Sequence, residues 1–178
     1  MKILSFLLAF ALSFSAHAQL FLTQTGETRF FSKTPVEDIS AVNKKVGVVL
    51  NSQTGEIVVR MAITDFNFPN KLMQEHFNEN YLESEKYPYG LFRGKVQNLP
   101  DLTKPGTYDI SAPGSLDIHG VKQDRTMKGK LTVQGDKITL QSDLQVALVD
   151  HKIEVPKLVF AKIAEVIDVK NQFVLQKK

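Results

Sequence analysis

A chain of 178 residues with no cysteine and a formal net charge of +3 is long enough to bury a core without disulfide bonds. The absence of cysteine excludes thiol catalysis, zinc–thiolate sites and attachment of a lipid to a cysteine at the N-terminus. Lysine and arginine form no long run, so we expect no nucleic-acid partner.

The first 18 residues have the three parts of a cleavable signal peptide. Lys2 is followed by an apolar run over residues 3–14 and by the small–x–small sequence Ala16-His17-Ala18. This apolar run is too short to cross the roughly 30 Å hydrocarbon core of a bilayer. We therefore expect residues 1–18 to be removed. Residues 19–178 are then expected to form one exported domain, periplasmic or secreted, with a net charge of +2 and no transmembrane segment.

Residues 46–64 predict two strands joined by a turn. The turn is Asn-Ser-Gln-Thr-Gly at positions 51–55, and the second strand alternates between polar and apolar residues, as a half-buried strand does. The apolar face of this second strand carries Ile57, Val59, Met61 and Ile63.

A short inserted helix is expected near residues 71–80. Asn70 is a suitable N-cap, and Met73, Phe77 and Tyr81 follow at four-residue spacing, which places them in one apolar stripe. The stripe could seal a packed core. Alternatively it could form the ceiling of an apolar tunnel, a role that suits the adaptable side chain of methionine.

Turn sequences also divide the second half of the chain. Pro105-Gly106 and Pro113-Gly114 are interpreted as turns on either side of a strand over residues 107–112. Gly135-Asp136 predicts a tight hairpin turn before a long strand over residues 137–148.

The last two predicted strands each have an apolar face that one polar residue interrupts. In residues 137–148 the row reads Ile138, Leu140, Ser142, Leu144, Val146 and Leu148. In residues 165–176 it reads Ile167, Val169, Asn171, Phe173 and Leu175. The whole pattern predicts an all-β fold of eight or more antiparallel strands closed into a barrel, with a β-sandwich as the competing architecture. The inserted helix favours the barrel, because it would cap one mouth.

Three features together resemble the YceI-like, polyisoprenoid-binding family of exported lipocalin-like proteins. They are the signal peptide, the sequence Gly-Ser-Leu-Asp-Ile-His-Gly-Val at 114–121, and the helix with its exit, which runs from Met73, His76 and Phe77 through Tyr87-Pro88 to Phe92. Gln74-Glu75 and Lys122 stand where the family often has Arg-Asp and Thr, which indicates a divergent member.

The resemblance implies an eight-stranded antiparallel barrel with a helix at one end and a tunnel for a polyprenyl chain. The candidate tunnel residues are Ile57, Val59, Met61, Ile63, Met73, Phe77, Phe92, Leu140, Leu144, Val146 and Ile167. The candidate polar residues at the tunnel mouth are His76, Tyr87 and His119. Both histidines could instead serve as structural hydrogen-bond partners, and Tyr87 could equally pack against the helix exit.

No nucleophile elbow, phosphate-binding loop or dinucleotide fingerprint occurs in the sequence. The histidines outside the signal peptide, at 76, 119 and 151, are too widely spaced to form a local metal-binding pair, so we expect no metal and no cofactor.

We expect a carrier or scavenger of an apolar or amphiphilic chain, isoprenoid-like, without covalent catalysis. One alternative is a filled barrel that acts as a protein-interaction or stress-response module. A third is an exported hydrolase or isomerase, which would require at least two of Glu75, His76, Asp117 and His119 to converge in a pocket.

Overall fold

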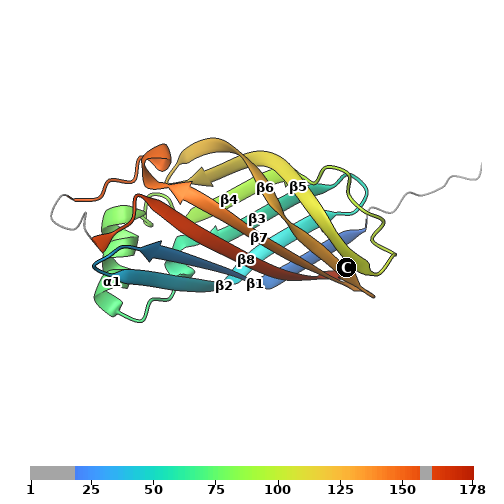
Figure 1. Ribbon diagram of the computed structural model, residues 1–178, viewed down its shortest axis with the longest axis horizontal. Coiled ribbons are helices and arrows are strands. Elements are labelled where there is room, and N and C mark those ends of the chain that lie inside the picture. Colours follow the sequence, from blue (N-terminus) through green and yellow to red (C-terminus); the bar gives the residue numbers. More distant parts are fainter. Residues whose placement is uncertain (1–18, 157–161) are drawn as a thin grey trace, which may run out of the picture.

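The structure is a computed structural model that describes residues 19–156 and 162–178, so the predicted signal peptide lies outside the described residues. Eight antiparallel strands close into one barrel, in which each strand pairs with its sequence neighbours and the last pairs with the first (Figure 1). The strands are β1 (Leu20–Lys33), β2 (Asp38–Asn51), β3 (Glu56–Ala62), β4 (Tyr89–Lys95), β5 (Gly106–Ile118), β6 (Val121–Gln134), β7 (Lys137–Ala147) and β8 (Val166–Lys177). The expected all-β, lipocalin-like barrel is confirmed.

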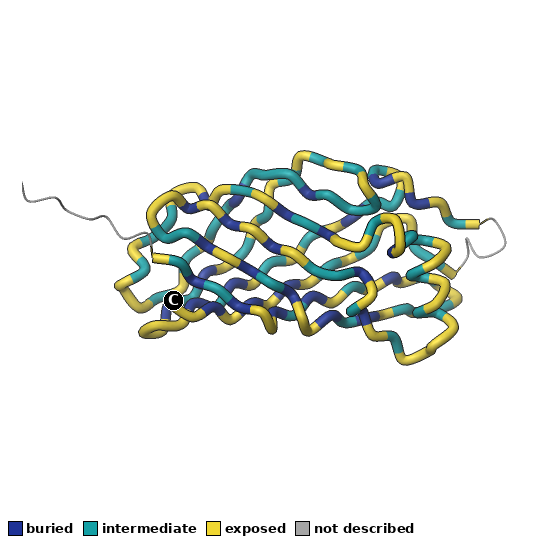
Figure 2. Tube along the Cα trace, turned by 180° about the vertical axis from the view of Figure 1, so that it is seen from behind, coloured by how far each residue is buried: buried dark blue, intermediate teal, exposed yellow. Residues whose placement is uncertain are grey.

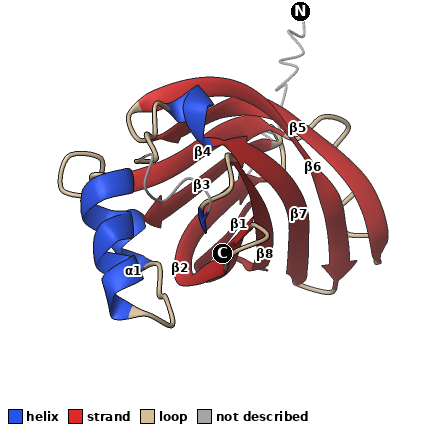
Figure 3. Ribbon diagram, turned by 60° about the vertical axis from the view of Figure 1, so that its left-hand side comes forward, coloured by secondary structure: helices blue, strands red, loops and turns tan. Residues whose placement is uncertain are grey.

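Short helical segments gather at the end of the barrel opposite the C-terminus (Figures 1 and 3). They are η1 (Ile63–Asp65), α1 (Lys71–His76), the π-helical turn η2 (Phe77–Tyr81) and η3 (Leu148–His151). In the described part of the chain, no helix combines the length and the apolar character that a membrane crossing requires.

The inserted helix begins where its sequence predicts. The side-chain oxygen of Asn70 accepts hydrogen bonds from the backbone N–H groups of Leu72, at 2.9 Å, and Met73, at 3.5 Å. This cap satisfies two of the N–H groups that a helix start leaves without partners. The helical backbone then continues through η2 to Tyr81, close to the predicted end at residue 80.

Burial alternates along the strands, as the sequence pattern predicts (Figure 2). Val46, Val48 and Leu50 on β2 are completely buried, whereas Val49 between them is exposed. With Leu131, Ile138 and Leu175 they belong to a close-packed core cluster in the half of the barrel near the C-terminus. These side chains therefore fill part of the interior.

The prediction of a turn at Pro113-Gly114 is wrong, because both residues lie inside the long strand β5. Gly114 pairs with Gly94 of β4, and a Cβ atom at Gly114 would lie 2.3 Å from the carbonyl oxygen of Arg93. Glycine here permits a close approach of two strands rather than a turn. The β4–β5 ladder ends at this pair, so Pro113 has no β4 partner that would require its missing N–H.

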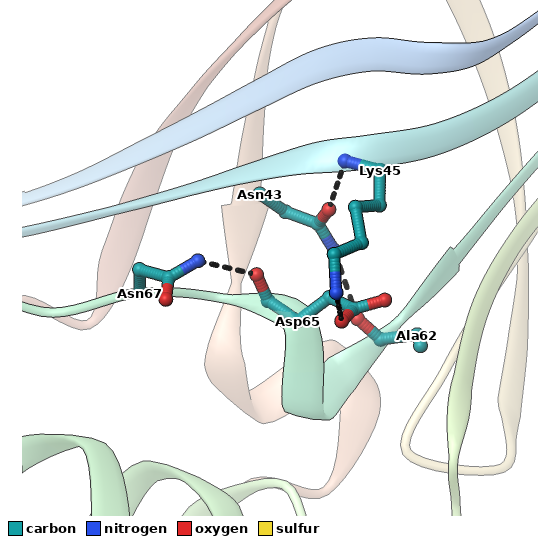
Figure 4. A network of polar contacts seen from close by, with 5 residues as sticks. All are labelled: Asn43, Lys45, Ala62, Asp65 and Asn67. Atoms are coloured by element: carbon teal, nitrogen blue, oxygen red, sulfur yellow. Dashed lines mark hydrogen bonds and ion pairs between the residues drawn. The ribbon is translucent and has the colours of Figure 1, made fainter.

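The β2–β3 ladder covers only part of the two strands, from Leu50 opposite Ile57 to Gly47 opposite Arg60. Beyond that point the buried side chain of Asn43 joins them: its Nδ2 donates to the carbonyl oxygen of Ala62 at 2.9 Å, and its Oδ1 accepts from the N–H of Lys45 at 2.8 Å (Figure 4). Asn43 thus replaces backbone pairing where the strands separate.

Candidate ligand-binding site

The barrel encloses a cavity of about 560 Å³, which is within the usual size range of small-molecule sites and extends from α1 as far as Ile57 of β3 and Val96 beyond β4. Residues from all eight strands and from α1 and η2 line it. Its wall includes all of the predicted tunnel residues, namely Ile57, Val59, Met61, Ile63, Met73, Phe77, Phe92, Leu140, Leu144, Val146 and Ile167. Their contact with a ligand stays a prediction.

An aromatic cluster forms the part of the wall nearest the helix. The rings of Phe30, Phe66 and Phe68 surround Phe77 of η2, with centroids 5.0–5.6 Å from its ring. Phe30 comes from β1, whereas Phe66 and Phe68 precede the helix. Of these four rings only Phe77 is among the predicted tunnel residues, although the alternation Phe-Asn-Phe at 66–68 is a signal that one face of this segment is buried.

A row of polar side chains crosses the mainly apolar wall. Thr28 on β1, Asn171 on β8 and Ser142 on β7 are register partners on adjacent strands. The hydroxyl of Thr28 donates to Asn171 Oδ1 at 2.7 Å, and Asn171 Nδ2 donates to Ser142 Oγ at 3.2 Å. Ser142 and Asn171, which interrupt the two apolar rows of the sequence, therefore meet inside the barrel and line the cavity.

The polar residues near the helix end differ in how they are partnered. Asn70 caps α1, and Glu37 lies 3.8 Å from Lys162, measured between carboxylate oxygen and Nζ. His76 lines the cavity, and its contact with a ligand stays a prediction. Burial raises the pKa of the nearby Tyr81 phenol, since the charged phenolate loses more from desolvation than the neutral form.

Tyr87 and His119, the other two predicted mouth residues, do not line the cavity. His119 lies in the β5–β6 turn, where Nε2 is 2.7 Å from a carboxylate oxygen of Glu83 and Nδ1 is 3.0 Å from the carbonyl oxygen of His151. The Tyr87 ring packs edge-on against the imidazole, with centroids 4.6 Å apart. These contacts join the helix exit, the turn and η3, so both residues hold the cavity rim together from outside.

The completely buried His151 also connects elements outside the cavity wall. Its Nδ1 lies 3.1 Å from the carbonyl oxygen of Val121 and 3.3 Å from that of Ile118, so it ties η3 to the β5–β6 turn. In the described residues no three side chains of the metal-ligating types lie together.

Two of the side chains considered for catalysis, His76 and His119, lie in different surroundings. Of Glu75, His76, Asp117 and His119, only His76 is on the cavity wall. A hydrolase or isomerase would require at least two of the four residues to gather around the cavity, and they do not.

An eight-stranded antiparallel barrel with a helix at one end and an internal apolar cavity defines a lipocalin-like protein. Within this class the chain belongs to the family of the YceI-like domain, whose sequence profile matches residues 11–175. No curated protein matches the chain.

Solved structures share the fold at low sequence identity. A polyisoprenoid binding domain from Saccharophagus degradans, implicated in plant cell wall breakdown, has a TM-score of 0.80 and 14% identity and covers 91% of this chain and 100% of its own. BcnA of Burkholderia cenocepacia has a TM-score of 0.70 and 14% identity, over 84% of this chain and 95% of its own. The YCEI protein of Campylobacter jejuni has a TM-score of 0.60 and 15% identity, and the match covers 75% of this chain and 81% of its own.

Proposed function

We propose that this protein binds the apolar chain of a lipid, polyisoprenoid or similar in character, inside its barrel and carries or sequesters it without covalent chemistry. The observation that supports this proposal is the cavity of about 560 Å³ with a wall made mainly of aliphatic and aromatic side chains. An apolar chain that moves from water into contact with such a wall is stabilised by about 0.8 kcal/mol for each methylene group that is buried.

Two further observations favour a ligand over a completely filled barrel. Completely buried side chains such as Leu131 and Leu175 occupy part of the interior, but the wall residues from α1 as far as Ile57 and Val96 enclose a space. In addition, a structural neighbour is named as a polyisoprenoid binding domain. A barrel filled along its whole length, as the protein-interaction alternative supposes, does not account for this space.

The proposal is tested by measuring affinity against chain length with saturated carboxylic acids and with the isoprenoid alcohols farnesol and geranylgeraniol. Displacement of a fluorescent fatty acid gives the dissociation constants. We expect each added methylene group to tighten binding by about fourfold at most until the cavity is full, after which affinity levels off.

A tryptophan in the cavity provides the matched test. Leu144→Trp places a large ring in the cavity, whereas Lys137→Trp places the same ring at an exposed position of the same strand β7. We expect the first variant to lose binding while its circular dichroism stays native, and the second to bind as the unmodified protein does. Unchanged binding by a folded Leu144→Trp variant, or no binding by the unmodified chain, would refute the proposal.

We also propose that the protein is exported. The supporting feature is the signal-peptide pattern of residues 1–18. Expression in a bacterium with two membranes, followed by fractionation and intact-mass measurement, tests it. The expected product starts at Gln19 and is in the periplasmic fraction, and a full-length chain in the cytoplasm would contradict export.

A further inference from the structure

The backbone pairing of the barrel wall is interrupted between β6 and β7. Their ladder runs from the hairpin turn to Gly129 opposite Ser142 and ends there. Beyond this pair, residues 121–128 of β6 pair with β5, and residues 143–147 of β7 pair with β8, but the two edges do not pair with each other. The two strands are neighbours in the wall (Figure 3), so this is a gap in its hydrogen bonding.

The gap opens the cavity toward the outside. Lys128 and Gln141 are exposed, yet they contribute to the cavity lining, and so do Gly129, Ser142 and Asn171 beside them. The same five residues also line a groove of about 920 Å³ that crosses the outer surface of β5 to β8 and β1. A Cβ atom at Gly129 would lie 2.1 Å from the carbonyl oxygen of Gln141, so glycine here lets β6 and β7 approach closely where the gap begins. The cavity and the groove share this stretch of wall.

The far end of the gap is closed by side chains. Gln123 Nε2 donates to the carbonyl oxygen of Asp150 at 2.7 Å, and Arg125 forms an ion pair with the Asp150 carboxylate. Both bonds connect β6 to η3, which follows β7. The opening is therefore confined to the stretch between Arg125 and Gly129.

Hydrogen-bond donors without acceptors lie at this opening. Ser142 Oγ accepts from Asn171, which leaves its own proton free to donate toward the cavity. Two cations of the outer groove are paired, Arg29 with Glu27 and Lys130 with Asp109. Among the described residues Lys128 has no ion pair.

The remaining carboxylate beside the opening is Asp143 on the edge of β7. It is exposed and is the register partner of Lys170 on β8, whose ammonium lies 6.0 Å from the centroid of the Phe31 ring. Asp143 is a carboxylate that cannot donate, so the donors of the opening are Ser142 and Lys128.

We propose that this opening is a side portal that holds the polar group of the bound amphiphile. The proposal rests on the proposed function. Ser142 and Lys128 donate to an acceptor oxygen of the ligand, such as a carboxylate oxygen, while the apolar chain extends from there toward the aromatic cluster and α1. The preferred ligand is then an apolar chain that ends in an oxygen-rich, hydrogen-bond-accepting head group.

The orientation of the ligand tests the portal. Because the chain has no cysteine, Asp143→Cys at the portal, Leu72→Cys at the helix end and Lys95→Cys on the exposed side of β4 each carry one fluorophore. Stearic acid with a nitroxide near its carboxyl end is expected to quench the Asp143→Cys label most strongly. With the nitroxide near the methyl end, the Leu72→Cys label should be quenched most, and the Lys95→Cys label is the control for collisional quenching.

The reverse pattern would put the head group at the helix end, beside His76, and would overturn the portal while leaving lipid binding intact. If unlabelled stearic acid does not displace a fluorescent fatty acid from the unmodified protein, the proposed function itself fails.

A second variant tests the chemistry of the portal. Ser142→Ala is expected to weaken stearate binding by about tenfold, since a hydrogen bond to a charged group is lost. Ser40→Ala, at an exposed position of β2, should bind stearate as the unmodified protein does. Equal affinity of Ser142→Ala and the unmodified protein would also overturn the portal.

Discussion

Single polar side chains inside this barrel have two different roles. Asn43 is completely buried and has both ends of its amide satisfied by backbone groups, so it belongs to the framework. Ser142 is half-buried, lines the cavity and keeps a free donor. A buried polar group with all its partners stabilises the fold, whereas one with spare capacity on a cavity wall is available to a ligand.

Replacing Asn43 tests its framework role. In Asn43→Ala the N–H of Lys45 and the carbonyl oxygen of Ala62 lose their partner where the β2–β3 ladder has ended (Figure 4). We expect the free energy of unfolding to fall by about 3 kcal/mol, measured by urea denaturation. Asn67→Ala is the matched control, because its exposed side chain makes one bond, to the carbonyl oxygen of Asp65, and should cost about 0.5 kcal/mol. Equal losses in the two variants would contradict this role.

Tyr81 provides a pH-dependent measurement at the cavity. Burial raises its pKa above the ordinary value of 10.0, so this phenol should ionise at higher pH than an exposed tyrosine. Because the pKa of Tyr81 is raised in the folded state, folding favours the neutral phenol. The free energy of unfolding is therefore unaffected by this group below the ordinary pKa and falls as pH rises through the folded pKa. The tyrosinate absorbance of the unmodified protein, compared with Tyr81→Phe, should show a late transition that the variant lacks. A normal titration of Tyr81 would mean that water has free access to its hydroxyl.

The sequence predicts the types of residue in the cavity better than their grouping. Alternation identifies the apolar faces of β3 and β7, because strand geometry sends every second side chain to the same side. Ser142 and Asn171 are recognisable in the sequence as polar residues that interrupt apolar rows. Their hydrogen bond, however, depends on the register between β7 and β8, which no local pattern encodes. Similarly, His119 is recognisable as a polar residue beside a glycine, whereas its contact with Glu83 depends on where the helix exit folds back.

At the scale of elements, the turns are predictable where local conformation decides them. Gly135 and Gly120 both have positive φ, at 60° and 69°, in two-residue hairpin connections. Pro113-Gly114 has the same type of composition but lies in β5, because close contact between β4 and β5 requires the glycine. Composition alone does not separate a glycine needed for a turn from one needed for strand contact.

The two hairpin glycines give a matched pair of substitutions. A Cβ atom at Gly120 would lie 2.4 Å from Cε1 of Tyr87, whereas at Gly135 it would have no atom within 4 Å. Gly135→Ala should therefore cost only the unfavourable backbone conformation, about 1 kcal/mol, and Gly120→Ala about 3 kcal/mol, because the Tyr87 ring must also move. Thermal and urea unfolding measure both values. Similar costs would show that Tyr87 moves freely and does not hold the rim.

At the scale of the whole molecule, the barrel follows from the strand pattern but the cavity does not. Eight alternating segments with short connections and an inserted helix are sufficient to favour closure, because closure removes exposed strand edges. Whether the interior is full depends on the sum of side-chain volumes at each level of the barrel. Here large side chains such as Leu50, Leu131 and Leu175 fill part of the interior. Near α1, the helix and the cluster of Phe30, Phe66, Phe68 and Phe77 cover a space instead.

Native mass spectrometry of the freshly purified protein tests most directly whether this space holds a lipid. We expect a second species, heavier than the chain by the mass of one small molecule, which disappears after extraction with organic solvent. The extract should contain an apolar chain with an oxygen-containing head group. Detection of the bare chain alone, together with no added mass after incubation with geranylgeraniol or stearic acid, would contradict the account.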